Sequence, residues 1–468
     1  MASVKGSQLA FFGPGVGQSS LNNVVTTDGT NPPSGPTVSG SFNIEVFTTA
    51  AAAAAGLAAG FQASAFVQGA VKVPGTNNEI VAGSRGSTEQ LLSGNYFVVD
   101  RTGGETIQMA GSGALSVAGS AGDTISGSAV SGSQQLMDLS GTNAIVKSGP
   151  MTAIGGAGNT TVWAASGDSF TGGAGADTIA GNGGSNMKIT GGTGNLTAFN
   201  FGTGNSVTGS TSGFTFVGDG YGGSANTIGG GASSGPGTDA GGVSFTQGTE
   251  IIAGNKDVIN GGSGTMLVNA LGASGVTVTG GSGAATVWGG AGGAVTGGSG
   301  ALQFNDGVGT KVTGGAGALN AFQLGAGNTI SGGSSTNVIN DAYGLGGNSS
   351  LIGGAGSSTI FGGSGDTIQG GTGALEARIL QGFGTATVNL GTAASGVRDV
   401  ASVVGSAGTK ATVTGFLTAS DVIESATNVT GTTFTGTSSV SGGNTLLTFT
   451  DGNTMTIVGV TTGIKFTT

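Results

Sequence analysis

The side chains best suited to chemistry in this chain are aspartates inside glycine-rich turns. Asp177 belongs to the run Gly172-Gly173-Ala174-Gly175-Ala176-Asp177-Thr178-Ile179-Ala180. Asp123, Asp168 and Asp366 each follow a glycine in a shorter turn and stand two residues before an apolar side chain. A turn aspartate commonly accepts hydrogen bonds from the backbone of its own turn, so a purely structural role is one interpretation of all four.

The residue types that most enzymes need are missing or sparse. The chain has no His and no Cys, which removes the usual general base, the commonest transition-metal ligand and the thiolate nucleophile. Between residues 102 and 377 the only cations are Lys147, Lys188, Lys256 and Lys311. A β-helical enzyme acting on acidic polysaccharides needs convergent basic residues or a metal, so we predict that the protein is not an enzyme.

Composition indicates a repetitive β structure. The chain holds 104 Gly but only 7 Pro among 468 residues and has no Gly-X-Y period, which excludes a collagen-like triple helix. Charged residues make up only 7% while Val, Ile, Leu and Phe recur regularly, which is the opposite of a disordered chain. The net charge of −10 leaves no basic stripe, so we expect no nucleic-acid partner.

Gly-Gly pairs recur along the chain and define the elements that must position the aspartates. They stand at 261, 280, 297, 314, 332, 353 and 370, a period of roughly 17–18 residues. Each unit has a longer half, as in Gly280–Val287, and a shorter half, as in Gly327–Gly333. Glycine permits positive φ or close backbone approach, and the strand that follows points Val, Ile or Phe inward. The pattern predicts an all-β fold, a parallel β-solenoid of the β-roll or β-helix type, over residues 106–375.

The segments that flank the repeats differ from them in composition and periodicity. Residues 1–40 carry several Pro and Gly and are predicted to form an extended arm. Residues 41–105 are predicted to form a small mixed cap with an Ala-rich helix and strands at 42–47 and 96–99, and residues 376–468 a β-rich C-terminal cap. The run from Thr48 to Val71 is interrupted by Gln, Ser and Gly, so no transmembrane span is expected. Residues 1–7 lack the pattern of a cleavable secretory signal.

The run Gly172–Ala180 resembles the nonapeptide of the hemolysin-type, or repeats-in-toxin, calcium-binding repeat family, Gly-Gly-x-Gly-x-Asp-x-apolar-x. The resemblance implies calcium held by Asp177 and by the turn backbone around Gly173 and Gly175, with Asp123, Asp168 and Asp366 as weaker ligands. Elsewhere the repeats are degenerate, because Ala285 and Ser358 occupy the aspartate position and Asp306 is displaced. Low calcium occupancy is therefore expected, and hydrogen bonds within the turn remain the alternative.

The C-terminal region resembles the end of that family which type I exporters bind. Its features are Phe416 and Asp421 within residues 413–423, and the closing residues Ile464 and Phe466. Asp451-Gly452, between two alternating runs, predicts a hairpin with a type I′ turn. The resemblance implies export by type I machinery to the bacterial cell surface or the extracellular space, and a simple β cap is the alternative.

These features predict a secreted structural protein that assembles with copies of itself into a surface layer, filament or biofilm matrix. A solenoid leaves strand edges open at its ends, and such edges favour polymers unless they are capped. An adhesin that binds cell-surface polysaccharide is the alternative, and a polysaccharide-modifying enzyme is a lesser one. Trp163, Trp288, Phe304 and Phe322 either stack on sugars or fill the core.

Overall fold

The structure, a computed structural model, describes residues 151–468 with short gaps, and upstream of residue 151 it describes separate strands. The gaps are 182, 221, 234, 236, 239–243, 246–247, 343–346, 381–384, 392–396, 405–407 and 426–427. The chain divides into two compact units, Met1–Glu250 and Ile251–Thr468, and each is described by itself. The described residues contain no helix, and hence none long and apolar enough to cross a membrane.

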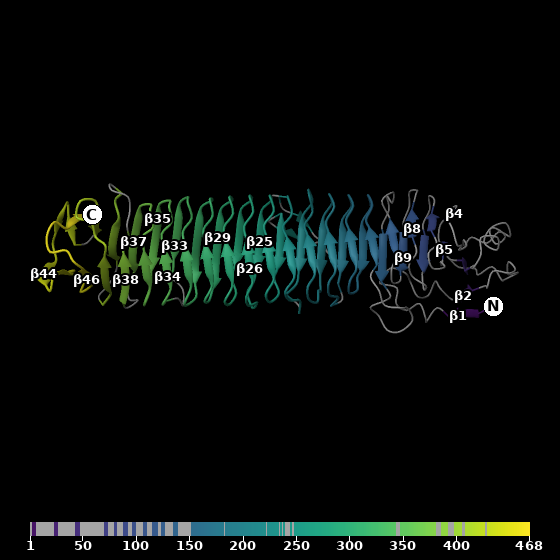
Figure 1. Cartoon of the computed structure of the whole chain (residues 1–468), viewed down its shortest axis with the longest axis horizontal. Coiled ribbons are helices and arrows are strands. Elements are labelled where there is room, and N and C mark those ends of the chain that lie inside the picture. The colour runs from purple at the N-terminus through teal and green to yellow at the C-terminus, as the bar shows by residue number, and fades with distance from the viewer. Residues whose placement is uncertain are drawn as a thin grey trace. The chain divides into compact units, whose positions relative to one another are not determined.

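Both units are built from stacked coils, each with one longer and one shorter strand joined by two turns (Figure 1). Strands of the same kind pair in parallel from coil to coil, so the predicted all-β parallel solenoid is confirmed. Longer strands of the second unit begin at residues 266, 285, 302, 319, 337 and 358, and a coil averages about 19 residues. This is slightly more than the 17–18 expected from the Gly-Gly pairs, because some turns carry inserted residues.

In the first unit the longer strands are β9 (Leu115–Gly119), β11 (Gln134–Asp138), β13 (Thr160–Trp163), β15 (Asp177–Ala180), β17 (Leu196–Phe199) and β19 (Thr215–Gly218). The shorter-strand row contains β8 (Thr106–Met109), β10 (Thr124–Ser126), β12 (Thr152–Ile154), β14 (Ser169–Thr171), β16 (Lys188–Thr190), β18 (Ser206–Thr208) and β20 (Thr227–Gly229). A short antiparallel pair follows, β21 (Gly237–Thr238) with β22 (Ser244–Phe245), and the division between the units falls within β23 (Thr249–Ile252).

In the second unit the longer row is β25 (Met266–Asn269), β27 (Ala285–Trp288), β29 (Leu302–Gly307), β31 (Leu319–Leu324), β33 (Asn337–Asn340), β35 (Ser358–Gly362), β37 (Leu375–Leu380), β39 (Val400–Val404), β41 (Val422–Glu424) and β47 (Lys465–Thr467). The shorter row is β24 (Val258–Asn260), β26 (Thr277–Thr279), β28 (Ala294–Thr296), β30 (Lys311–Thr313), β32 (Thr329–Ser331), β34 (Ser350–Ile352), β36 (Thr367–Gln369), β38 (Thr385–Asn389) and β40 (Lys410–Thr414).

The core lies between the two rows of strands. The middle residue of each three-residue strand from β10 to β36 in the shorter row is buried, as at Val295 and Ile330, and the first and third residues of the longer strands face the same interior. Burial of a Val or Ile side chain stabilises the fold by about 1.5–3 kcal/mol, and the same inward position is filled in coil after coil. Cohesion therefore comes from many small contributions together with the backbone ladders.

Upstream of the coils, β1 (Ala2–Lys5), β2 (Asn23–Thr26), β3 (Asn43–Val46), β4 (Ala70–Val73), β5 (Glu79–Val81), β6 (Thr88–Leu91) and β7 (Tyr96–Val99) are placed as strands. Thus β3 and β7 occupy the two segments predicted as strands. Parallel pairing begins before residue 106, because β6 pairs with β8 and β7 with β9. The predicted Ala-rich helix lies outside the described residues.

The C-terminal region ends in β44 (Thr437–Ser441), β45 (Asn444–Thr448) and β46 (Thr454–Ile457), an antiparallel set whose last strand pairs in parallel with β40. A small antiparallel pair, β42 (Val429–Thr430) with β43 (Thr433–Phe434), precedes it. The hairpin at Asp451-Gly452 is present, but the predicted type I′ turn is wrong. Gly452 has φ +86° while Asp451 has no positive φ, and the Gly452 N–H donates to the Phe449 carbonyl (3.0 Å), as in a type I turn followed by a left-handed glycine.

A second hairpin turn was not predicted from the sequence. Gly442 and Gly443 both have positive φ, 57° and 79°, and join Ser441 to Asn444 in a two-residue loop. Both values match the type I′ turn that had been assigned to Asp451-Gly452. A Gly-Gly pair is a strong signal for such a turn, but in this chain it is hidden among many Gly-Gly pairs that serve coil stacking.

Candidate functional site

The Gly-Gly-x-Gly turns, where calcium was expected, are shaped by close stacking of the backbone. A Cβ on Gly173 would collide with the carbonyl oxygen of Gly156 in the preceding coil, and one on Gly175 would collide with that of Gly158. The same collision recurs one coil later at Gly192 and Gly194. These glycines have no positive φ, so it is the missing side chain that the fold requires.

The other turn of each coil requires glycine for a different reason. In the shorter row from β14 to β36, the residue two positions before each strand adopts left-handed backbone, with φ between 56° and 86°. Most members of this column are Gly, but Asn, Ala and Lys also occur in it: Gly167, Asn186, Gly204, Ala225, Lys256, Gly275, Gly292, Gly309, Gly327, Asn348 and Gly365. Positive φ or close backbone approach was expected in every turn. In the structure, close approach explains the glycines of the Gly-Gly-x-Gly turns, and positive φ explains those of the other turn.

The aspartates of the shorter turns bind the backbone of neighbouring residues. Asp168 accepts hydrogen bonds from the N–H of Met151 in the preceding coil (2.8 Å) and from the N–H of Ala165 in its own turn (2.8 Å). Asp366 repeats this with the N–H groups of Ser349 (2.9 Å) and Gly363 (2.6 Å). Asp123 holds the same position before β10 and is buried. These side chains thus tie one coil to the next.

Asparagine fills the same column elsewhere and forms the same bond. Asn205 accepts from the N–H of Met187 (2.8 Å), and Asn328 accepts from the N–H of Thr310 (2.8 Å). A neutral amide oxygen therefore substitutes for a carboxylate at this position. Where the column holds Asp or Asn, the property that the two share is a hydrogen-bond acceptor, and a negative charge is not required for the bond.

Asp177 does not supply the surroundings that calcium needs. Its side chain is 2% exposed, and the Gly173 N–H donates to its Oδ2 (3.1 Å). Burial raises its pKa to about 6, against hydrogen bonds from Thr160 and Gly173 that lower it. The neighbouring residues in its strand column are Thr160 and Leu196, and the described residues hold no group of three or more acidic side chains. Calcium takes six to eight oxygen ligands, so this site does not fit the ion.

The buried aspartates of the second unit include one close carboxyl pair. Burial, and then the charge of Asp366, raise the pKa of Asp341 to about 7, while a hydrogen bond from Ser349 opposes the rise. Burial also raises the pKa of Asp399 to about 6, partly offset by the N–H of Leu375, which donates to it (2.9 Å). No basic side chain contributes to either shift. The Asp341–Asp366 pair is therefore protonated at higher pH than ordinary aspartates.

The residues predicted to serve export or assembly are built into the C-terminal fold. Asp421 accepts from the N–H of Leu417 (2.7 Å) and closes a turn beside the buried Phe416. Asp451 accepts from the N–H of Asn453 (3.0 Å) in the hairpin turn with Gly452. Ile464 precedes β47, where Phe466 stacks on Phe434 with ring centroids 5.0 Å apart. Asp421, Asp451 and Gly452 therefore belong to turns, Phe416 and Phe466 pack, and export remains a prediction.

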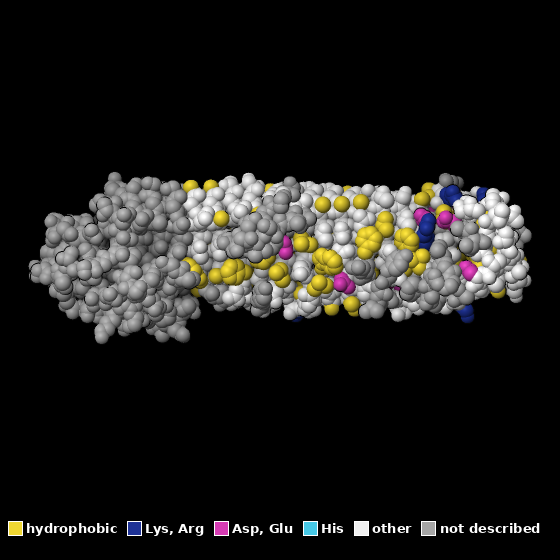
Figure 2. All heavy atoms as spheres, turned by 180° about the vertical axis from the view of Figure 1, so that it is seen from behind, with side chains coloured by type: hydrophobic (Ala, Val, Ile, Leu, Met, Phe, Trp, Pro, Cys, Tyr) yellow, Lys and Arg dark blue, Asp and Glu magenta, His cyan; other side chains and the backbone are white. Residues whose placement is uncertain are grey.

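The aromatic residues separate into core and surface. Phe304 is fully buried and belongs to the core. Trp163, Trp288 and Phe322 are partly exposed on the outer face of the longer strands, as is Phe361, which the sequence analysis did not single out. Figure 2 shows hydrophobic side chains in a broken line along one face of the molecule.

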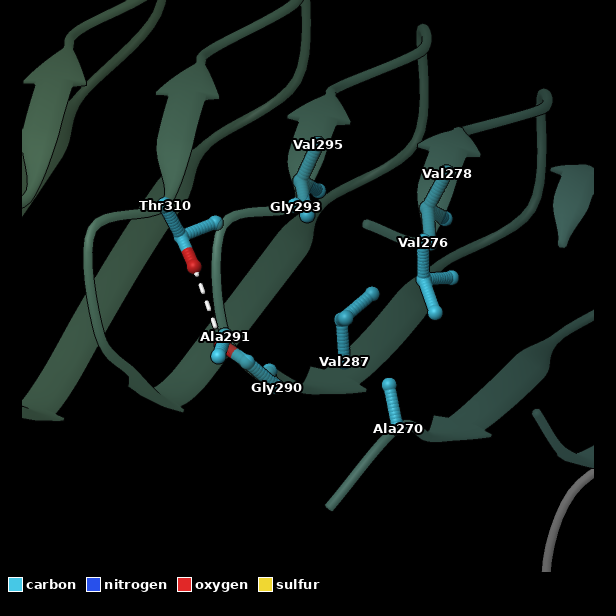
Figure 3. A pocket seen from close by; sticks show the side chains of 10 residues that line it. Ala270, Val276, Val278, Val287, Gly290, Ala291, Gly293, Val295 and Thr310 are labelled. Atoms are coloured by element: carbon cyan, nitrogen blue, oxygen red, sulfur yellow. Dashed lines mark hydrogen bonds between the residues drawn. The ribbon is translucent and has the colours of Figure 1, made fainter. Parts of the chain in front are cut away.

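An apolar cavity of about 10 Å³ lies inside the second unit (Figure 3). It is lined by small residues that include Val276, Gly293 and Ala291, and the Thr310 hydroxyl donates to the Gly290 carbonyl beside it (3.1 Å). Val276 and Gly293 occupy the column that Asp and Asn fill in other coils, so the cavity lies where polar side chains are missing. Its volume is at the lower limit for one water molecule, which is too small for a substrate.

Comparison with protein-family models, curated proteins and solved structures finds no match to this chain. Membership of the repeats-in-toxin family therefore stays a prediction that rests on the single full nonapeptide at Gly172–Ala180.

Proposed function

We propose that this protein is a secreted structural scaffold whose copies assemble into an extracellular layer, filament or matrix. The observation that carries the proposal is the C-terminal edge strand β44. All five of its residues, Thr437-Ser438-Ser439-Val440-Ser441, are exposed, and none is charged or Pro. Within the described part of the chain it pairs only with β45. Natural proteins usually protect such an edge with charge or Pro, because an open edge recruits further strands.

The register of the hairpin identifies the groups that are open to a partner. Ser441 and Asn444 flank a two-residue loop and form a hydrogen-bonded pair, so Ser439 and Thr437 also direct their backbone groups toward β45. Ser438 and Val440 then direct theirs away from it. Val440 is 57% exposed. Pairing of this edge with a different strand of a second copy produces an open polymer, whereas pairing with its own counterpart produces a closed dimer.

The test compares assembly of the unaltered protein and three variants by light scattering and electron microscopy. Val440→Lys and Ser438→Pro each block the outer edge and are expected to raise the concentration needed for assembly about tenfold. Val458→Lys adds the same charge at another exposed Val (39%) and is expected to assemble like the unaltered protein. The proposal fails if the unaltered protein stays monomeric at every concentration, or if all three variants assemble normally.

A further inference from the structure

A column of alternating aromatic and amide residues follows the outer face of the longer strands in the second unit. Strand pairing places Trp288 opposite Asn305, Asn305 opposite Phe322, and Asn340 opposite Phe361. The column continues from Asn269 before Trp288 to Arg378 after Phe361. We name the residues Trp288, Asn305, Phe322, Asn340 and Phe361 the aromatic–amide ladder.

The period of the ladder is set by the strands. Neighbouring strands lie about 4.8 Å apart, so aromatic rings on every second coil repeat at about 9.6 Å. The intervening coils present carboxamide groups, which both donate and accept hydrogen bonds. The ladder itself carries no charge, and the first ion pair beyond it, Arg378 with Glu376, is held by a hydrogen bond from Arg378 Nε to Glu376 Oε1 (2.6 Å).

One residue of the ladder is buried and holds a polar group without a partner. The rings of Trp288, Phe322 and Phe361 remain partly exposed, while Asn305, between two of them, is only 4% exposed. The Nδ2 of Asn305 is buried and has no hydrogen-bond partner, although its Oδ1 accepts from Gln303 (3.4 Å). A buried amide N–H without a partner costs about 1–3 kcal/mol, and a ligand with hydroxyl oxygens offers an acceptor.

From this arrangement we infer that the aromatic–amide ladder binds an extended, uncharged β-1,4-linked polysaccharide that lies along the stack of coils. Flat aromatic rings pack against the apolar faces of pyranose rings, and carboxamides exchange hydrogen bonds with sugar hydroxyls. The ring repeat is close to the length of one disaccharide in such a chain, so alternate sugars meet an aromatic ring and a sugar between Phe322 and Phe361 meets the partly exposed amide of Asn340. In the first unit the corresponding column, Trp163, Ala180, Phe199 and Gly218, has no amides.

The test measures depletion of the full-length protein by cellulose and by chitin, with α-linked dextran as the comparison polymer. Trp288→Leu, Phe322→Leu and Phe361→Leu keep an apolar side chain but remove the ring, and each is expected to weaken binding to the β-linked polymers about tenfold. Phe322→Tyr is expected to retain binding. Leu417→Ala and Val458→Ala, at apolar residues 45% and 39% exposed in the C-terminal region outside the ladder strands, serve as matched controls and are expected to bind normally.

The inference fails if the unaltered protein binds neither polymer, if it binds dextran equally well, or if the control variants lose binding as strongly as the ring variants. Analytical ultracentrifugation of the ring variants identifies the competing occupant. If they lose self-association and not glycan binding, the ladder contacts a second copy of the chain and the inference is wrong. Glycan binding is measured in the Val440→Lys background as well, so that failure of assembly and failure of the ladder are distinguished.

Discussion

At the residue scale, the buried aspartates differ in what surrounds their charge. Asp168 accepts two backbone N–H groups, and in other coils the equivalent residue is a neutral Asn. Asp341 instead lies near a second carboxyl group, Asp366, and its charge is opposed by burial and by that neighbour. Asp168 is therefore an effective hydrogen-bond acceptor, whereas Asp341 makes the stability of the fold sensitive to pH.

Asp341 predicts a stability that decreases as the pH rises. Its pKa is about 7 in the folded chain and near 3.8 in the unfolded chain, so the folded state binds more protons between these values. The stabilisation is complete below pH 3.8 and is lost as the pH approaches 7. We expect Asp341→Asn to raise the melting temperature at pH 8. The melting temperature of this variant should also change less between pH 4 and 7 than that of the unaltered protein, as measured by circular dichroism.

Asp306→Asn provides the control for that experiment, because this aspartate is exposed and its left-handed φ of 60° suits Asn. Its profile is expected to follow that of the unaltered protein. Equal slopes for Asp341→Asn and the unaltered protein would show that the carboxyl pair does not control the pH response.

At the element scale, the two turns of a coil predict losses of stability of different size for the same Gly→Ala substitution. Gly298→Ala places a Cβ against the carbonyl oxygen of Gly281, and we expect it to reduce local stability by roughly 3 kcal/mol or more. In Gly292→Ala the new Cβ lies in open space, so the expected loss of stability comes only from the left-handed φ of 64° and is about 1–2 kcal/mol. Lys256→Gly removes the same strain at φ 59° and is expected to stabilise β24 by about 1 kcal/mol.

Hydrogen exchange of the amides in β24 and β28 measures these effects locally, which suits a stack of coils that need not unfold in one step. The order expected for opening free energy is Lys256→Gly above the unaltered protein, then Gly292→Ala, then Gly298→Ala. Equal effects of the two alanine variants would refute the distinction between the turns.

Local patterns predicted the repeating elements well, but not the contacts between coils. The glycine period and the inward Val and Ile sufficed for the solenoid, because each coil repeats the same short-range rule. The choice between metal ligand and backbone acceptor at Asp168 and Asp177 depends on the preceding coil, 17 residues away, and no local spacing contains that information. Phe361 was missed for the same reason, since its ladder becomes visible only once the strand register is known.

At the scale of the whole molecule, the chain carries 22 acidic and 12 basic residues, and this net negative charge attracts divalent cations without specificity. Specific binding of a divalent cation, in contrast, requires several carboxylates at one place. Within the described residues no group of three acidic side chains is placed to hold a metal ion, and Asp168 and Asp366 accept hydrogen bonds from backbone N–H groups. The coils are therefore expected to stack through hydrogen bonds and the burial of their inward side chains, without a bound metal ion.

This leads to a prediction for the intact protein in calcium and in chelator. A site saturated at a hundred times its dissociation constant stabilises the folded state by about 2.7 kcal/mol, which would raise the melting temperature by several degrees. We expect no such difference between calcium, magnesium and chelator, and Asp177→Asn is expected to be at least as stable as the unaltered protein because it removes a buried charge. A calcium-specific rise that disappears in Asp177→Asn would instead establish the family's metal site, and the hydrogen-bonded stack would then be only part of what holds the coils together.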